Sequence, residues 1–242
     1  MNRKRKPIKK ARIVFIGDSL THGNISVNFI KMIAKKLGKK YDYINAGMNA
    51  ELAYNVLLRL ESIIACKPDF ITILIGTNDA SAELKDIKDK KSIEMLNLPR
   101  KPDKNWYIKN LEKIISELKE KTDAKIAICS IPIMGEETSS KAFKLSIDYS
   151  KTIHEIANKH KINYLSVNEK MVDYLKQYPS NPKYPYEKRL VEDTVYKHFL
   201  FRKSFDKISE EYGFSLLVDH VHLNSKGSKI IADLILDFII SK

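Results

Sequence analysis

The stretch Arg12-Ile13-Val14-Phe15-Ile16-Gly17-Asp18-Ser19-Leu20-Thr21 decides the fold class, because an apolar run changes abruptly into a polar turn. The first five residues predict a buried β-strand, and the Gly-Asp-Ser that follows marks its end. Four further short runs are also rich in β-branched and aromatic residues: Tyr41–Ile44, Phe70–Ile75, Lys125–Ser130 and Ile162–Ser166. Short, nearly continuous apolar strands of this kind are typical of a sheet that is covered on both faces.

Longer segments with a helical pattern lie between these strands. Their apolar residues recur at intervals of three and four positions, as in Val27–Leu37, Ala53–Ala65, Trp106–Glu120 and Ala142–His160. Alternation of strand and helix predicts a mainly parallel sheet with helices on both faces. In such sheets, ligands bind beyond the carboxyl ends of the strands.

The composition is that of one globular domain. The chain has 242 residues, of which 43% are hydrophobic and 30% are charged, and this excludes disordered and fibrous classes. Cys66 and Cys129 lie in apolar stretches without a metal-ligand spacing, which argues against a disulfide scaffold and a zinc ribbon. No signal core or membrane-spanning stretch is visible, so we expect a cytoplasmic protein.

Positive charge is concentrated at the N-terminus. The net charge is +13, and residues 1–12 hold seven Lys or Arg and no acid; without them the net charge falls to +6. We expect residues 1–12 to be a disordered, solvated tail and residues 13–242 to be the single domain. Weak contact of this tail with anionic lipid or nucleic acid is the open alternative.

Two stretches interrupt the alternation and are expected to be insertions. Residues 80–103 are polar and rich in lysine, without a clear period. Residues 178–214 begin with three prolines, turn helical, and contain nine of the chain's 22 aromatic residues. We expect the second stretch to be a packed helical arm before the last helix, with a lid over a pocket as the alternative.

Polar clusters follow the first three predicted strands. Gly17-Asp18-Ser19 lacks the commoner Gly-x-Ser-x-Gly pattern of hydrolases and by itself favours a simple turn. Residues 45–49 (Asn-Ala-Gly-Met-Asn) and 76–79 (Gly-Thr-Asn-Asp) each combine a glycine with an asparagine. A backbone N–H and a side-chain amide from two such turns can converge on one point, as a developing oxyanion requires.

A fourth cluster, Asp219-His220-Val221-His222, precedes the final predicted helix. Asp219 and His222 can meet within one turn, so that the carboxylate fixes the imidazole tautomer and leaves the other ring nitrogen free as a base. Taken alone, this spacing is common in surface turns and helix caps.

In this order, the four clusters resemble the GDSL, or SGNH, hydrolase family, over residues from Ile13 to about Ile239. The resemblance implies a three-layer α/β/α sandwich with a flavodoxin-like, five-stranded parallel sheet. It implies Ser19 as nucleophile, His222 as general base and Asp219 as the residue that orients His222. The oxyanion hole would comprise the N–H groups of Ser19 and Gly47 and the side-chain amide of Asn78. No metal or organic cofactor is expected.

The chain departs from the family pattern in two places. Asn49 and Ala50 stand where a small residue and a second glycine are frequent, so the loop near the oxyanion hole has room to take another path. His220 replaces the glycine of the Asp-Gly-x-His pattern. We expect His220 to face solvent and keep His222 as the base.

The favoured function is a serine hydrolase that cleaves small-molecule carboxylic esters or thioesters through an acyl-enzyme intermediate. Short acyl esters and acyl-CoA thioesters rank above a carbohydrate O-deacetylase, because no export signal is visible. A binding protein that uses the basic tail is an alternative of another class, and its nucleic-acid or membrane binding would depend strongly on salt. The intact site residues argue against an inactive scaffold, and no apolar stripe predicts an oligomeric state.

Overall fold

A computed structural model describes residues 10–84 and 98–241 and contains one five-stranded sheet. The strands are β1 (Ala11–Gly17), β2 (Tyr41–Gly47), β3 (Phe70–Leu74), β4 (Lys125–Cys129) and β5 (Asn163–Leu165). All neighbours pair in parallel, in the order β2-β1-β3-β4-β5. This is the flavodoxin-like order, so the predicted sheet is confirmed.

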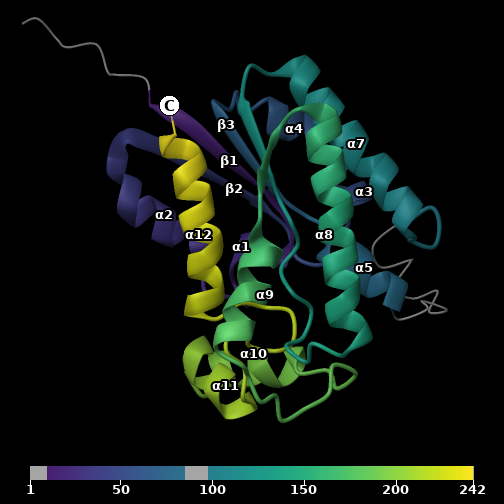
Figure 1. Cartoon of the computed structure of the whole chain (residues 1–242). Coiled ribbons are helices and arrows are strands. Elements are labelled where there is room, and N and C mark those ends of the chain that lie inside the picture. The colour runs from purple at the N-terminus through teal and green to yellow at the C-terminus, as the bar shows by residue number, and fades with distance from the viewer. Residues whose placement is uncertain (1–9, 85–97, 242) are drawn as a thin grey trace, which may run out of the picture.

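Helices cover both faces of the sheet and form the outer two layers (Figure 1). One face carries α2 (Phe29–Leu37), α9 (Val167–Gln177) and α12 (Ser225–Ile240). The other face carries α3 (Ala53–Leu58), α4 (Leu60–Ile64), α5 (Thr77–Leu84), α7 (Lys104–Lys121) and α8 (Lys141–His160). The predicted α/β/α sandwich is therefore also confirmed.

The two cores arise from the alternation of side chains along the strands. In β1, Ile13 and Phe15 belong to one buried cluster, whereas Val14 and Ile16 belong to the other. Successive residues of a strand point to opposite faces, so an uninterrupted apolar run serves both layers.

The helix after β2 and the start of the first strand differ from the sequence prediction. The predicted helix Ala53–Ala65 divides into α3 and α4 at Arg59, whose backbone leaves the helical region. The first strand begins at Ala11, and the N–H of Arg12 donates to Asp69 Oδ2 over 2.7 Å. Residues 11 and 12 thus belong to the sheet, whereas residues 1–9 of the predicted tail lie outside the described residues.

The two predicted insertions are placed in part. The first begins as α5, and its residues 85–97 lie outside the described part of the chain. The second contains α10 (Val191–Phe199) and α11 (Phe205–Tyr212), which lie at the lower end of the molecule in Figure 1. Phe205 and Tyr212 join the core beside α12, whereas Phe199, Leu200 and Phe201 are exposed.

Three adjacent strands end at the same edge and bring their loops together. Gly17 pairs with Gly47 on one side and with Leu74 on the other. A Cβ atom on Gly17 would lie 2.2 Å from Thr21 Oγ1 and 2.4 Å from the Leu74 carbonyl oxygen. Glycine at this position therefore allows the chain to turn tightly between its neighbours.

Within the described ranges, no helix has the length and apolar character needed to cross a membrane.

The central position of β3 predicts a large effect of truncating its core side chain. Ile73 is fully buried, whereas Ile240 on α12 is 63% exposed. Ile73→Ala should lower the free energy of unfolding by about 2–5 kcal/mol, because it removes buried methyl groups and leaves a cavity. Ile240→Ala, the matched control, should change it by less than about 0.5 kcal/mol. Urea denaturation followed by circular dichroism measures both, and equal effects would contradict this packing.

Candidate active site

Ser19, His222 and Asp219 form a continuous hydrogen-bonded chain at the carboxyl edge of the sheet. Ser19 opens the short helix α1 (Ser19–His22) directly after β1, and its Oγ lies 3.0 Å from His222 Nε2. The other ring nitrogen of His222, Nδ1, lies 3.0 and 2.9 Å from the two carboxylate oxygens of Asp219. The structure thus brings together all three residues that the sequence assigned to the triad.

Residues 217–223 make a closed loop around Asp219. Leu217 and Leu223 form an isolated antiparallel bridge, and the N–H of Val218 donates to the His222 carbonyl oxygen over 2.7 Å. Asp219 Oδ1 accepts the N–H groups of Val221 and His222 at 3.2 and 2.9 Å. We call this segment the 217–223 loop. Its turn places the Asp219 carboxylate beside the ring of His222, three residues further along the chain.

The charges of Asp219 and His222 stabilise each other in a buried setting. Burial lowers the pKa of His222, but the charge and the hydrogen bond of Asp219 outweigh this and hold the pKa above its usual value. Burial raises the pKa of Asp219, but His222 and the N–H donors of the loop bring it below its usual value. An ionised Asp219 beside a basic His222 is the arrangement that activates a serine hydroxyl.

Asn78 connects the turn after β3 with the loop that follows β2. Its Nδ2 donates to the Glu51 carbonyl oxygen over 3.0 Å and lies 3.4 Å from Asp18 Oδ2. Asp79 strengthens the same connection, because its Oδ2 accepts the N–H of Ala53 over 3.2 Å. Asn78 therefore reaches both the Ser19 turn and the loop after β2.

Asp18 and Asp79 are both buried and both titrate abnormally. Burial raises the pKa of each carboxyl group to about 7. Asp18 Oδ1 accepts the N–H of Leu20 over 2.9 Å, which braces the turn that carries Ser19. Asp18 thus fixes the turn after β1, and Asp79 fixes the loop after β2.

Gly47 does not present its N–H to this site. That N–H donates to Asn45 Oδ1 over 2.9 Å. Glycine is needed at position 47 for a different reason, since a Cβ there would lie 2.4 Å from the backbone nitrogen of His22. The sequence identified the right loop, but the donor that it named is engaged by a neighbouring side chain.

The sequence profile of the GDSL-like Lipase/Acylhydrolase family matches residues 15–230. The chain belongs to this family. Its members hydrolyse esters, so the chain is an ester hydrolase. A comparison with curated protein sequences gives no significant match.

Solved structures of esterases share the fold of this GDSL-like hydrolase. The acetyl xylan esterase AlAXEase is 19% identical, with 95% of this chain and 100% of that chain covered and a TM-score of 0.68. Axe2, an acetylxylan esterase from Geobacillus stearothermophilus, is 17% identical, with 96% and 95% covered and a TM-score of 0.68. At these identities the likeness concerns the fold.

The first departure from the family pattern lies at Ala50. Its φ is 63°, a left-handed conformation that favours glycine, and no hydrogen bond joins its N–H to another described residue. The following residue, Glu51, binds Arg59 through both carboxylate oxygens, and Arg59 also donates to the Ala46 carbonyl oxygen over 2.7 Å. Sequence reasoning missed this ion pair, which clamps the loop that holds Ala50.

The second departure, His220, is buried, although the sequence led us to expect that it faces solvent. It is 4% exposed, and its ring packs against Tyr186 and Phe214, with centroids 5.5 and 4.9 Å away. Its φ of 78° is the conformation that a glycine would adopt, and this directs the ring toward the aromatic insertion. His222, and not His220, contacts Ser19, so the assignment of the base agrees with the geometry.

Glu136, in the loop after β4, is a further buried charged residue that sequence reasoning missed. It is 4% exposed, and its carboxylate accepts three backbone N–H groups of residues 215–217. Burial raises its pKa, and these N–H donors oppose the rise.

Within the described ranges, no group of three or more His, Cys, Asp or Glu side chains is arranged to hold a metal ion.

The electrostatics of His222 give a prediction that does not depend on a substrate. The imidazole should titrate above its ordinary value of about 6.5, and Asp219→Asn should lower the midpoint, because burial then acts without an opposing charge. A pH titration of the imidazole by ¹H–¹⁵N NMR measures this midpoint. Asp233→Asn, on the exposed side of α12, is the control and should leave it unchanged. Equal midpoints in wild type and Asp219→Asn would contradict the proposed coupling.

Proposed function

We propose that Ser19 is the nucleophile of a serine hydrolase that cleaves carboxylic esters or thioesters through an acyl-enzyme. The observation that carries this proposal is the 3.0 Å contact between Ser19 Oγ and His222 Nε2, with Asp219 on the other ring nitrogen. A serine hydroxyl is a weak nucleophile at neutral pH and needs an adjacent base. The family membership supplies the reaction class, and this contact supplies the base.

In the first step, Ser19 Oγ forms a bond to the carbonyl carbon while His222 Nε2 takes its proton. The tetrahedral intermediate collapses when the bond to the leaving oxygen or sulfur breaks, and His222 returns the proton to that atom. Water then repeats the sequence on the acyl-enzyme: it adds to the carbonyl carbon and gives a proton to His222. The bond to Ser19 Oγ breaks, His222 returns the proton to Oγ, and the acid is released. Asp219 stabilises the imidazolium that forms in both halves.

The negative charge of the tetrahedral intermediate needs preorganised donors. We propose the N–H of Ser19 and the Asn78 amide. One Nδ2 proton of Asn78 is held by the Glu51 carbonyl oxygen over 3.0 Å, and the other has only a long bond of 3.4 Å to Asp18 Oδ2, which an oxyanion would replace. For the third donor we propose the N–H of Ala50 in place of that of Gly47, because the Gly47 N–H is engaged by Asn45. The left-handed Ala50 and the bond between Asn78 and the Glu51 carbonyl support this choice.

The solved neighbours support the assignment of the triad. Three structures of the Geobacillus stearothermophilus esterase are described as catalytic mutants, in which a serine, an aspartate and a histidine are replaced. In that enzyme the aspartate lies three positions before the histidine, which is also the spacing of Asp219 and His222.

The substrate that we propose is a small ester or thioester with a short acyl chain. A carbohydrate O-acetyl ester is the second candidate, favoured by the acetyl xylan esterases among the structural neighbours. Rates of acid release from p-nitrophenyl esters of increasing chain length, acetyl-CoA and acetylated xylo-oligosaccharides separate these candidates. A much higher kcat/KM on the oligosaccharide would favour the deacetylase.

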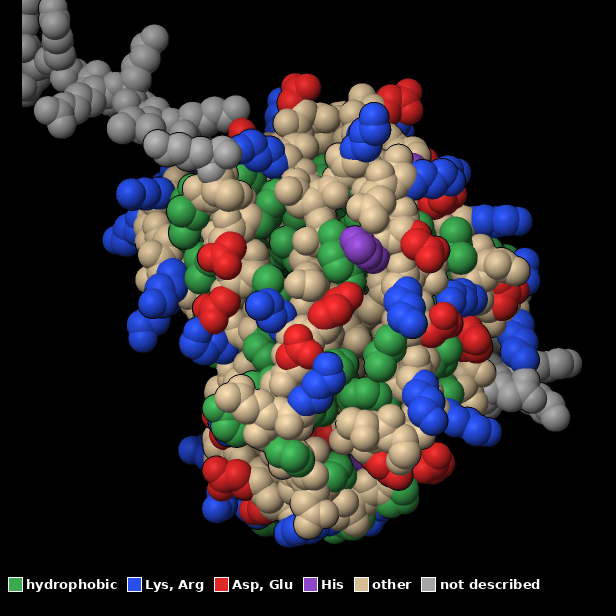
Figure 2. Space-filling model, viewed as in Figure 1, with side chains coloured by type: hydrophobic (Ala, Val, Ile, Leu, Met, Phe, Trp, Pro, Cys, Tyr) green, Lys and Arg blue, Asp and Glu red, His purple; other side chains and the backbone are tan. Residues whose placement is uncertain are grey.

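The distribution of surface charge does not specifically favour the alternative of a nucleic-acid or membrane binder. Lys and Arg side chains are spread over the face seen in Figure 2 and alternate with Asp and Glu. Among the described residues, several lysines are paired with carboxylates, as Lys159 is with Glu112 and Lys203 with Glu211. Of residues 1–12, the tail that motivated this alternative, residues 1–9 lie outside the described residues, and Ala11 and Arg12 belong to β1.

Labelling with a fluorophosphonate tests the proposed nucleophile. Wild-type protein should gain one phosphonyl adduct in intact-mass measurement, because an activated Ser19 Oγ displaces fluoride from phosphorus. Ser19→Ala should gain none, and Ser62→Ala, which removes a hydroxyl bonded to the Arg59 carbonyl oxygen, should label as wild type does. A folded wild type that resists labelling would remove the main support for the proposal.

Removal of the Asn78 amide tests the oxyanion hole. Asn78→Ala should lower kcat by about 10²–10³, the usual effect of deleting one oxyanion donor, with a smaller change in KM. Steady-state kinetics on a p-nitrophenyl ester measure both. Asn105→Ala, at an exposed position of α7, is the matched control and should keep normal turnover. Near-normal turnover of Asn78→Ala would show that the donor is assigned wrongly.

A further inference from the structure

The loop after β4 binds the backbone that leads into the 217–223 loop. Glu136 Oε1 accepts the N–H groups of Leu216 and Leu217, each at 2.7 Å, and Oε2 accepts that of Ser215 at 2.7 Å. The preceding residue, Gly135, donates its N–H to the His220 carbonyl oxygen, also over 2.7 Å. Two consecutive residues thus hold the 217–223 loop at its entrance and at its tip.

These contacts are directly continuous with the triad. Leu217, held by Glu136, pairs with Leu223, and the next residue, Val218, donates to the His222 carbonyl oxygen. Asp219 follows immediately. A shift of the backbone at residues 215–217 would therefore displace Asp219 and His222 together, relative to a Ser19 that is carried by β1 on another part of the chain.

The chemistry of Glu136 fits a role in positioning. A buried carboxylate is costly unless its charge is compensated. Among the described residues no Lys, Arg or His forms an ion pair with Glu136, so the three N–H groups supply the compensation. Charge-assisted hydrogen bonds of this kind are shorter and stronger than neutral ones. The distances of 2.7 Å agree with this.

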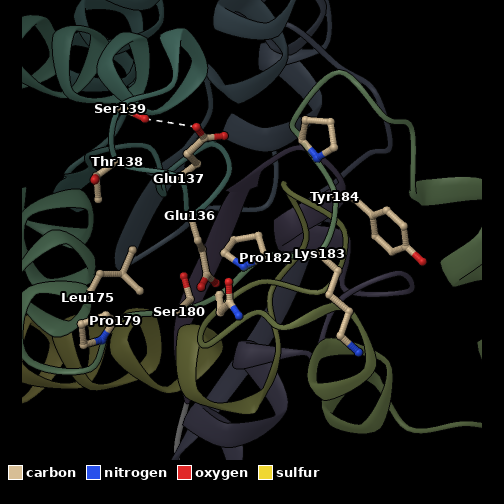
Figure 3. A pocket seen from close by; sticks show the side chains of 12 residues that line it. Glu136, Glu137, Thr138, Ser139, Leu175, Pro179, Ser180, Pro182, Lys183 and Tyr184 are labelled. Carbon is tan, nitrogen blue, oxygen red and sulfur yellow. Dashed lines mark hydrogen bonds between the residues drawn. The ribbon is translucent and has the colours of Figure 1, made fainter.

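We propose that Glu136 is a positioning residue for ester hydrolysis, whose carboxylate fixes the backbone of residues 215–217 and thereby aligns Asp219 and His222 with Ser19. This inference rests on the proposed function of the triad. The bonds of Glu136 are to the backbone of residues 215–217 and not to the triad side chains. It lies on the wall of a cavity of about 510 Å³ between the loop before α8 and residues 179–185 (Figure 3).

Glu137 offers a matched control on the wall of the same cavity. Its side chain is exposed and accepts the Ser139 hydroxyl over 3.1 Å, instead of a set of backbone N–H groups (Figure 3). Glu136→Gln and Glu137→Gln therefore remove the same charge from adjacent residues. In Glu136→Gln one acceptor oxygen remains, but the new NH₂ group opposes at least one backbone N–H.

The test combines kinetics per active site with the pH profile. Fluorophosphonate titration counts the competent sites, and steady-state rates on a p-nitrophenyl ester are divided by that count. Glu136→Gln should lower kcat roughly 10–100-fold, as a small misplacement of catalytic groups does, and change KM little. The acid limb of kcat/KM should move to lower pH, because a displaced Asp219 raises the pKa of His222 less. Glu137→Gln should match wild type in both.

Other outcomes would overturn the inference. If Glu136→Gln lowers only the number of titratable sites, while kcat per site and the acid limb stay at wild-type values, Glu136 is merely structural. Glu136→Asp keeps the charge with a shorter reach; it should give intermediate values, and it replaces the glutamine variant if that fails to fold. A wild type that is neither labelled nor active would instead contradict the proposed function of the triad. In that case the NMR midpoint of His222 in Glu136→Gln would still test the alignment.

Discussion

The hydrogen-bonded chain from Asp219 through His222 to Ser19 is the constraint on which the rest of the structure depends. It joins residues that are 203 positions apart in the sequence, so a distance of 3.0 Å must be maintained by the whole sandwich. Ser19 is placed by β1, an internal strand of the sheet, and His222 by a loop that runs directly into α12. Both supports are buried elements, which move less than surface loops do.

Close backbone approach is the second requirement, because three loops must share one sheet edge. Gly17 and Gly47 lie where any side chain would collide with backbone or side-chain atoms at 2.2–2.4 Å. Several polar groups at this crowded edge bind one another: Asn45 binds the Gly47 N–H, Asp79 binds the Ala53 N–H, and Asn78 binds the Glu51 carbonyl. The Asn78 amide is thereby oriented before any substrate arrives, as electrostatic catalysis requires.

Local patterns allowed the sheet to be predicted, since a buried parallel strand is a property of neighbouring positions, whereas the roles of Ser19, Asp219 and His222 were expected only from the resemblance to the GDSL family. The donor at Gly47, the exposure of His220 and the role of Glu136 were not predictable in this way. Each depends on a partner far along the chain or on a competition for one hydrogen bond: Asn45 for Gly47, Tyr186 for His220, and residues 215–217 for Glu136. Short motifs in a fixed order suggest which side chains meet at the sheet edge, but only the folded backbone shows which N–H groups are free.

The two departures from the family pattern obey one physical rule. Ala50 and His220 replace glycines that are frequent in the family, and both keep the left-handed backbone that glycine favours, at φ values of 63° and 78°. Such conformations cost of order 1–3 kcal/mol each, so the surroundings must enforce them. At Ala50 the enforcement comes from the Glu51–Arg59 ion pair, and at His220 from Tyr186 and Phe214. Tyr186 and Phe214 both belong to the aromatic insertion, so this segment supports the 217–223 loop directly. A support of this kind is fixed to the site, which favours a permanent wall beside the triad over a lid that opens and closes.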